Sequence, residues 1–256
     1  MKTPRPSAAG SIPVIPKVHA QLKRSLFQPG DIISYMEMCN QEGVSLQRGM
    51  NFRLRGTVSV ILMSRRPGAP YADRIEDGGN VLIYEGHDAP RRHDCPNPKK
   101  VDQPEYSGAG KLTQNGLFWR EATTYKDRGT LPAQVRVYDK IKTGIWTYAG
   151  VFELVDAWQD RKGGRRIFRF KLRASDNPGD PPEERYDVIT HTRLIPTEVK
   201  KEVWKRDKGK CVLCGSQENL HFDHDLPFSK GGTSLLSGNI RLLCAKHNLL
   251  KRDKIE

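Results

Sequence analysis

Two pairs of cysteine and histidine residues constrain the fold of this chain more than any other feature. Cys211 and Cys214 are separated by two residues, and Cys244 and His247 repeat that spacing after a long intervening segment. Thiolate and imidazole are the ligands of structural zinc sites, and the two-residue spacing lets both members of a pair reach one ion from a tight turn. The four residues therefore predict a tetrahedral zinc (Zn²⁺) site that closes the segment between them into a small domain.

The segment between the two pairs is longer than the loop of a small zinc ribbon, and it carries polar residues of its own. Asp223 and His224 are consecutive in a stretch expected to form a strand, Asn239 comes later, and Asn248 directly follows the last zinc ligand. Carboxylate and amide oxygens are hard ligands for a divalent cation, and the pKa of histidine is near neutrality. Hydrolysis of a phosphodiester needs both kinds of group.

The order of these residues resembles that of the HNH endonucleases, whose ββα-metal fold surrounds one catalytic metal ion. The resemblance covers roughly the last quarter of the chain. It implies that His224 is the general base, that Asp223 and Asn248 bind Mg²⁺ or another divalent metal, and that Asn239 braces the loop. His247 stands where many relatives carry a fourth cysteine, and Asn248 stands at the position of the family's final histidine.

The Asp223–His224 pair has a second interpretation, as a surface pair on a zinc module that binds nucleic acid without cutting it. His221 lies two residues before Asp223 and is therefore expected on the same face of the strand. A histidine at that position is more often a packing or phosphate-contact residue than a third metal ligand, so we leave His221 out of the catalytic set.

The charge of the chain favours a nucleic-acid partner, because 43 Lys and Arg against 30 Asp and Glu give a net charge of +13. Positive charge attracts phosphate through counterion release but reads no sequence. With three of the five cysteines assigned to zinc, Cys39 and Cys95 are expected to be reduced thiols of a cytoplasmic protein. The sequence shows neither a secretion signal nor a run long enough to span a membrane.

Composition divides the chain into four segments. Residues 1–30 contain five prolines and predict a flexible arm, residues 31–173 predict a β-rich domain, residues 174–196 are rich in turn formers and acids and predict a linker, and residues 197–256 form the zinc-stabilised domain. The fold class expected is α+β: a β-rich barrel domain followed by a small ββα-metal domain.

Two kinds of local pattern place the elements of the β-rich domain. Asp31 is expected to cap a short helix that ends at Gly43. Runs of β-branched and aromatic residues, separated by Gly, Pro, Asp and Asn, predict the strands. These strands are expected at residues 57–63, 81–84, 133–138, 146–155 and 167–172.

Short motifs of the β-rich domain follow the order found in SRA domains, modules that read modified cytosine by flipping it out of the duplex. The motifs lie at Tyr71 and at residues 79–86, 102–103, 111–115, 135–138, 148–152 and 167–172.

The SRA resemblance implies a pocket for the flipped base. In that pocket Tyr71 and Tyr84 stack on the base and Asp73 contacts its exocyclic amine, with Asp77 as the rival because the loop differs in length by one residue. An extruded base loses stacking and pairing, which an aromatic face and hydrogen bonds restore. The second interpretation makes both tyrosines ordinary half-buried strand residues.

Together the two resemblances imply a modification-dependent restriction endonuclease. It would recognise double-stranded DNA that contains 5-methylcytosine or 5-hydroxymethylcytosine and hydrolyse phosphodiester bonds nearby, with the linker keeping the two domains within reach of each other. One metal site cuts one strand at a time, so a homodimer is expected. The alternatives are an HNH endonuclease whose β domain reads unmodified sequence or structure, and a DNA-binding reader that does not cut.

Overall fold

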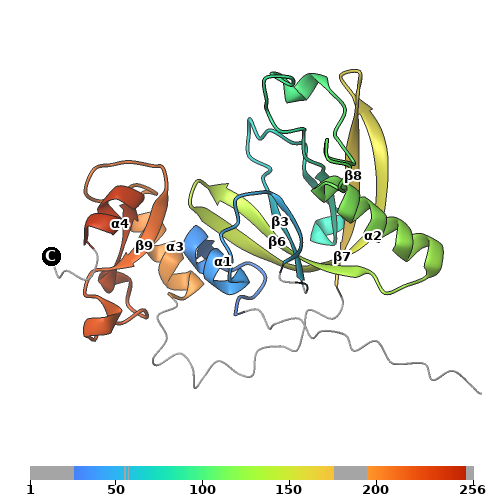
Figure 1. Ribbon diagram of the computed structural model, residues 1–256. Coiled ribbons are helices and arrows are strands. Elements are labelled where there is room, and N and C mark those ends of the chain that lie inside the picture. The colour runs from blue at the N-terminus through green and yellow to red at the C-terminus, as the bar shows by residue number, and fades with distance from the viewer. Residues whose placement is uncertain (1–25, 55, 57, 176–194, 252–256) are drawn as a thin grey trace, which may run out of the picture.

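The computed structural model describes residues 26–175 and 195–251, except 55 and 57 (Figure 1). Most of the expected arm, most of the expected linker and residues 252–256 lie outside the described residues. A β-rich amino-terminal part stands beside a small carboxy-terminal part, and the mixed α+β class expected from the sequence is confirmed (Figure 1). None of the helices described is long and apolar enough to cross a membrane.

The amino-terminal part is built on an eight-stranded sheet, and its described elements also include two α-helices and two 3₁₀ turns. Its elements are β1 (Ile32–Ser34), α1 (Tyr35–Glu42), β2 (Met50–Leu54), β3 (Val58–Met63), β4 (Arg74–Glu76), the 3₁₀ turn η1 (Asp77–Gly79), β5 (Val81–Glu85), the 3₁₀ turn η2 (Pro98–Lys100), α2 (Gln114–Arg128), β6 (Ala133–Lys142), β7 (Ile145–Lys162) and β8 (Arg165–Ala174). The five expected strands are all present, and β6, β7 and β8 are longer than expected.

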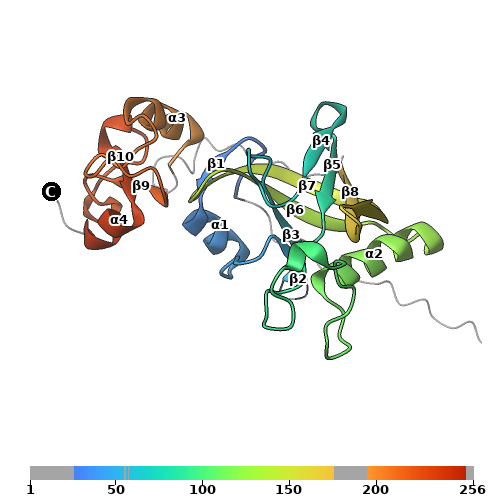
Figure 2. The same ribbon diagram turned by 90° about the horizontal axis from the view of Figure 1, so that it is seen from above.

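The strands follow the order β2-β3-β6-β7-β8-β5-β4, and β1 pairs with β7. Only the β3–β6 pair is parallel among the strand pairs of the described sheet. Helix α2, which the sequence analysis did not identify, lies alongside the sheet (Figure 2). Its Phe118 and Ala122 are fully buried in the main apolar core with residues such as Phe170, so α2 closes that core.

The start of the folded body differs from the sequence expectation. Ser34, not Asp31, is the N-cap of α1: its side chain accepts a hydrogen bond from the Glu37 amide, and the Glu37 carboxylate accepts one from the Ser34 amide. Residues 32–34 instead form a strand on β7. Phe27 is buried against Tyr148, so residues before Asp31 also pack on the sheet.

Helix α1 is fixed to the sheet by a buried ionic network. The Arg136 guanidinium donates to Glu42 Oε2 at 2.9 Å, and the Tyr138 hydroxyl donates to Glu42 Oε1 at 2.5 Å. All three side chains are almost completely removed from solvent. Because an unpaired charge at this depth is strongly destabilising, the network fixes α1 in one position on β6.

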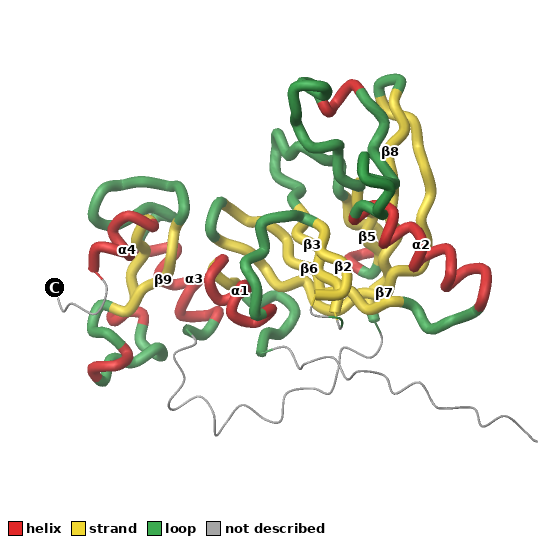
Figure 3. Tube along the Cα trace, viewed as in Figure 1, coloured by secondary structure: helices red, strands yellow, loops and turns green. Residues whose placement is uncertain are grey.

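The carboxy-terminal part contains a two-stranded antiparallel hairpin and two helices (Figure 3). Its elements are α3 (Thr197–Arg206), β9 (Leu220–His224), the 3₁₀ turns η4 (Phe228–Lys230) and η5 (Ser237–Asn239), β10 (Ile240–Cys244) and α4 (Ala245–Lys251). The small apolar core of this part includes Val203, Leu220 and Leu242, together with Ile145 from the amino-terminal part. The helix expected from Pro196 onward is therefore present, and the small domain shares its core with the large one.

Candidate functional site

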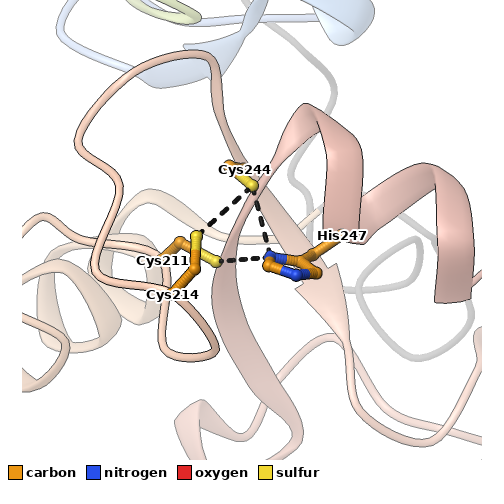
Figure 4. Close-up of side chains that lie close together, drawn as sticks. All are labelled: Cys211, Cys214, Cys244 and His247. Carbon is orange, nitrogen blue, oxygen red and sulfur yellow. Dashed lines mark hydrogen bonds between the residues drawn. The ribbon is translucent and has the colours of Figure 1, made fainter.

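The predicted zinc ligands form one cluster. Cys211 and Cys214 lie on the turn before β9, Cys244 ends β10, and His247 lies in the first turn of α4 (Figure 4). One ligand atom from each residue lies within 4.8 Å of the others. Among the described residues, this is the group of His, Cys, Asp and Glu side chains that has the geometry to hold a metal ion.

The distances inside the cluster match those of a tetrahedral zinc site. Bonds of about 2.3 Å to sulfur and about 2.0–2.1 Å to nitrogen give S···S edges of about 3.8 Å and S···N edges of about 3.6 Å. The structure has 3.8 Å between Cys214 Sγ and Cys244 Sγ, and 3.4 Å from His247 Nδ1 to both Cys211 Sγ and Cys244 Sγ. The donor set and its spacing therefore fit a zinc ion held by Nδ1 of the histidine.

The turn that carries the first pair also favours a thiolate. Burial works against a charged Cys211, but hydrogen bonds from the backbone of Cys244, Leu213 and Cys214 and from the His247 imidazole outweigh it and lower the pKa of Cys211 to about 6. The thiolate is the form of cysteine that binds metal. Backbone groups of the knuckle and of β10 therefore prepare this ligand for a cation.

The expected catalytic residues lie on the hairpin and helix that the cluster joins. Asp223 and His224 are the last two residues of β9, and Asp223 is opposite Arg241 on β10. His224 is only 6% exposed, and its Nε2 lies 2.8 Å from the hydroxyl of Ser234, which is 2% exposed. The ring of Phe228 lies 5.9 Å from the His224 ring. The His224 imidazole is thus held in one orientation.

Asn239 spans the loop that follows β9. Its Oδ1 accepts from the Leu226 amide at 2.8 Å, and its Nδ2 donates to the carbonyls of Leu226 and Thr233 at 3.2 and 2.9 Å. Gly232 lies inside this loop, where a Cβ atom would come within 1.8 Å of the Leu226 carbonyl oxygen. The tight loop thus requires glycine at position 232, and the Asn239 amide ties its two ends together.

Two residues that contact Asp223 or His224 were not identified from the sequence. Lys251 is 1% exposed, and its Nζ donates to Asp223 Oδ2 at 2.6 Å and to the His224 carbonyl. Ser234 contacts the His224 ring as described above. The spacing of Lys251 from Asn248 gives a signal in hindsight, because residues three apart share a helix face. Ser234 has no such signal, since its partner is ten residues away across an irregular loop.

The proposed ligands of a second, catalytic metal have the chemistry such a site needs. Asp223 offers a carboxylate at the end of β9, and Asn248 is a half-buried amide on the helix face that Lys251 shares. Mg²⁺ retains several waters and is commonly held by one or two protein oxygens. Both side chains therefore offer oxygen donors of the kind that Mg²⁺ accepts.

The β4–β5 hairpin separates the two candidates for the base contact. Asp73 immediately precedes β4, and its Oδ1 accepts from the Glu85 amide at 3.1 Å while its Oδ2 accepts from the Ser64 amide at 3.2 Å. Asp77 is an exposed residue at the opposite end of the hairpin, where Glu76 pairs with Val81. Asp73 therefore lies beside the strand that carries Tyr84, and Asp77 lies about 10 Å farther along it.

The two candidate stacking residues, Tyr71 and Tyr84, both contact His87. Tyr84 is 1% exposed, and its hydroxyl lies 3.0 Å from His87 Nε2. Tyr71 is half-buried and stacks on His87, with ring centroids 5.5 Å apart and planes 19° apart, while Lys99 Nζ lies 4.2 Å from the Tyr71 ring centroid. A base that stacks on Tyr71 would have to replace one of these contacts, and Tyr84 has almost no exposed surface.

The surroundings of Asp73 and Tyr84 are strongly polar. Glu85 is fully buried, its Oε2 lies 3.3 Å from Arg169 and 3.1 Å from Lys162, and its Oε1 lacks a hydrogen-bond partner. Burial raises the pKa of Asp73 to about 6 although two backbone amides lower it, and burial lowers the pKa of His87 to about 4. His87 is therefore neutral at pH 7, and the Glu85 oxygen has capacity for a donor.

Removing one thiol tests the zinc assignment. Cys211→Ser should eliminate zinc from the purified protein and unfold the carboxy-terminal part, because so small a core depends on the metal for its stability. Metal content by mass spectrometry and circular dichroism measure both effects. Cys95→Ser is the control, since Cys95 lies in the η2 loop, far along the chain from the cluster. Wild-type protein purified without zinc would contradict the assignment.

Replacing Tyr71, the less buried of the two tyrosines, tests whether its ring stacks on a base. We choose Tyr71→Ala over Tyr84→Ala, because truncating the fully buried Tyr84 would also open a cavity in the core. Loss of one stacking partner should weaken binding to duplexes with modified cytosine by about 1–3 kcal/mol. Binding to plain duplexes should not change, and Tyr106→Ala, a 56% exposed tyrosine, should affect neither. Equal losses on modified and plain duplexes, measured by fluorescence anisotropy, would refute this role of Tyr71.

Comparison with known proteins gives solved structures only. No family model and no curated protein matches the chain. The SRA domain of SUVH5 in complex with hemimethylated CG DNA is 23% identical, with a TM-score of 0.41 over 69% of this chain and 100% of that one. SUVH5 SRA bound to fully hydroxymethylated CG DNA is 22% identical with a TM-score of 0.39, over 61% and 94%. Arabidopsis thaliana SUVH6 in complex with SAM is 20% identical with a TM-score of 0.36, over 66% of this chain and 28% of that one.

Proposed function

We propose that the chain is a metal-dependent DNA endonuclease that acts on duplexes containing modified cytosine. The observation that carries the nuclease half is the ββα arrangement at the Cys–His cluster. Through the buried Lys251 ammonium it joins the end of β9, with Asp223 and His224, to helix α4, which also carries Asn248. A carboxylate, an amide and an oriented imidazole are the groups that phosphodiester hydrolysis requires.

In this proposal His224 takes the proton from the attacking water. The Ser234 hydroxyl at 2.8 Å from Nε2 orients the ring. Burial at 6% exposure keeps the ring in this orientation, and the Asn239 bonds hold the loop that carries Ser234. Orientation of the base through a second group is a general feature of proton transfer in active sites.

Asp223 and Asn248 would hold the catalytic Mg²⁺ or other divalent ion. Bound there, the ion would stabilise negative charge on the phosphate and on the leaving oxygen. The Lys251 ammonium, which is itself almost fully buried, holds the Asp223 carboxylate in place through an ion pair of 2.6 Å. The Cys211, Cys214, Cys244 and His247 cluster would hold structural Zn²⁺ and join the two strands to the helix.

In the reader half, Tyr71 would provide a stacking face and Asp73 would accept from the exocyclic amine of a flipped cytosine. Asp73 is already placed by two backbone amides next to the Tyr84 strand, and each carboxylate oxygen has room for a second donor. We propose 5-methylcytosine or 5-hydroxymethylcytosine as the base read, in double-stranded DNA. The restriction of modified DNA would follow from joining this reader to the nuclease.

A reader that binds without cutting is the second candidate, and one observation favours it. His224 is nearly inaccessible, and Asp223 Oδ2 is already bonded to Lys251. For cleavage, water must reach the His224 ring and a metal must share the Asp223 carboxylate with Lys251. The presence of every group needed for hydrolysis leads us to prefer the nuclease.

Because one such centre cuts one strand at a time, we propose that two copies act together on a duplex. Light scattering of the protein with and without a modified duplex tests this pairing. A single copy that breaks both strands without a nicked intermediate would contradict it.

Replacing the proposed base tests the nuclease. His224→Ala should retain zinc and DNA binding but lower the cleavage rate by about 10²–10⁴-fold, the usual contribution of general-base catalysis. Asp225→Asn is the matched control, because it removes a charge from the next residue, whose side chain is 45% exposed and pairs with Arg241. The rate of nicking of a modified plasmid with Mg²⁺ or Mn²⁺ is the measurement.

Two outcomes of that experiment decide between the candidates. A wild-type protein that binds the modified plasmid and never nicks it is the non-cutting reader. A His224→Ala variant that nicks at the wild-type rate would remove His224 from the mechanism.

A further inference from the structure

Helix α3 connects the two parts of the molecule through a buried lysine. Lys200 is 2% exposed, and its Nζ donates to the Ile32 carbonyl at 2.8 Å and to the Glu37 carboxylate oxygens at 2.9 and 3.1 Å. Figure 1 shows α3 beside α1, the helix that carries Glu37. An ammonium group is removed from water only at a large cost unless it is paired and fully hydrogen-bonded. Lys200 meets that condition only when α3 lies against β1 and α1.

A second residue of α3 completes the pairing of β1. Strand β1 bonds to β7 along one edge, with Ile32 opposite Thr147. On its other edge, the Ile32 amide donates to Thr197 Oγ1 at 3.2 Å, and the Thr197 hydroxyl donates to Asp31 Oδ1 at 2.9 Å. The amide and carbonyl of Ile32 are therefore both occupied by side chains of α3, in the way a neighbouring strand would occupy them.

Apolar side chains also pack between the amino-terminal and carboxy-terminal parts. Ile145, at the start of β7, is 1% exposed within the core of the carboxy-terminal part, next to Leu220 and Val199. Gly144 precedes it with φ +91°, and a Cβ atom there would lie 2.8 Å from the Leu220 carbonyl oxygen. Lys142 reaches across to Gln217 at 3.1 Å. The β6–β7 turn is thus shaped to receive the start of β9.

We infer that the reader and the nuclease form one rigid unit, so that the contact through β1, α1 and the β6–β7 turn sets the distance from the modified base to the cut. Residues 176–194 then connect the two parts without setting that distance. Relative motion is the usual expectation for domains in one chain unless their interface is apolar and well bonded. Here a buried ion pair, an occupied strand edge and a shared core all oppose such motion. The consequence for DNA rests on the proposed function, whereas the contact itself does not.

Lys200→Met tests the contact, since it removes the buried charge and keeps an unbranched apolar side chain. Lys201→Met is the matched control, because Lys201 is on the same helix, 57% exposed and paired only with Glu198 among the ion pairs of the described residues. Two readouts apply: hydrogen exchange at the Ile32 amide, and the positions of cuts in a duplex with one modified cytosine. Zinc content and affinity for modified DNA serve as checks on folding.

We expect the Ile32 amide to exchange about tenfold faster or more in Lys200→Met, because its bond to Thr197 depends on the docked helix. The narrow set of cut positions made by the wild type should broaden, while Lys201→Met should match the wild type in both readouts. Slow exchange and unchanged cut positions in Lys200→Met would overturn the inference.

An insertion into residues 176–194 gives a second test that leaves both folded parts unaltered. A flexible insert of about ten Gly and Ser residues lengthens a tether, yet cut positions should stay where they are if docking sets the distance. A shift of the cuts with insert length would overturn the inference. If the wild type cuts no duplex at all, the proposed function fails, and the exchange of the Ile32 amide still decides whether the two parts are docked.

Discussion

The carboxy-terminal part depends on the convergence of four side chains. Cys211, Cys214, Cys244 and His247 bring a turn, the end of a strand and the start of a helix within reach of one ion. Every proposed catalytic residue except Asn248 lies between the second and third of these side chains, so the cluster closes the segment that carries them. A domain of this size has too few apolar side chains for an independent core, and metal binding supplies folding free energy in such cases. The shared core with Ile145 supplies a second support.

Some features that depend on residues close together in the sequence were predicted correctly. The two-residue separation of the ligands predicted their cluster, and alternating β-rich runs predicted the strands of the sheet. The helix cap was wrong by three residues, because Asp31 and Ser34 are both good N-caps and the pairing of residues 32–34 with β7 decides between them. Helix α2 was missed because its first turn holds Asn115 and Gly116, which have low helix propensity and are tolerated here by tertiary contacts.

Contacts between distant segments supply the rest of both sites. Lys251 bonds to Asp223 across 28 positions, and Asn115 holds the backbone of His87 across 28 positions. No periodic pattern in the sequence encodes such pairs. In each candidate site, internal contacts occupy the groups that a ligand would use. Lys251 donates a hydrogen bond to Asp223. The His87 ring stacks on Tyr71, and the Lys99 ammonium lies over the same ring. In the proposed function, a metal ion and a flipped base would compete with these groups of the protein, which favours ligands that offer full charge or a complete stacking face.

We propose that one chain couples reading of a cytosine modification to cutting. Single-turnover cleavage of two duplexes that differ only in the methyl group of one cytosine measures this coupling directly, with the hydroxymethylated duplex as a third substrate. We expect cleavage of the modified duplexes near the modified base and no detectable cleavage of the plain one under the same conditions. Equal rates on all three duplexes would contradict it, because the nuclease would then act without the reader.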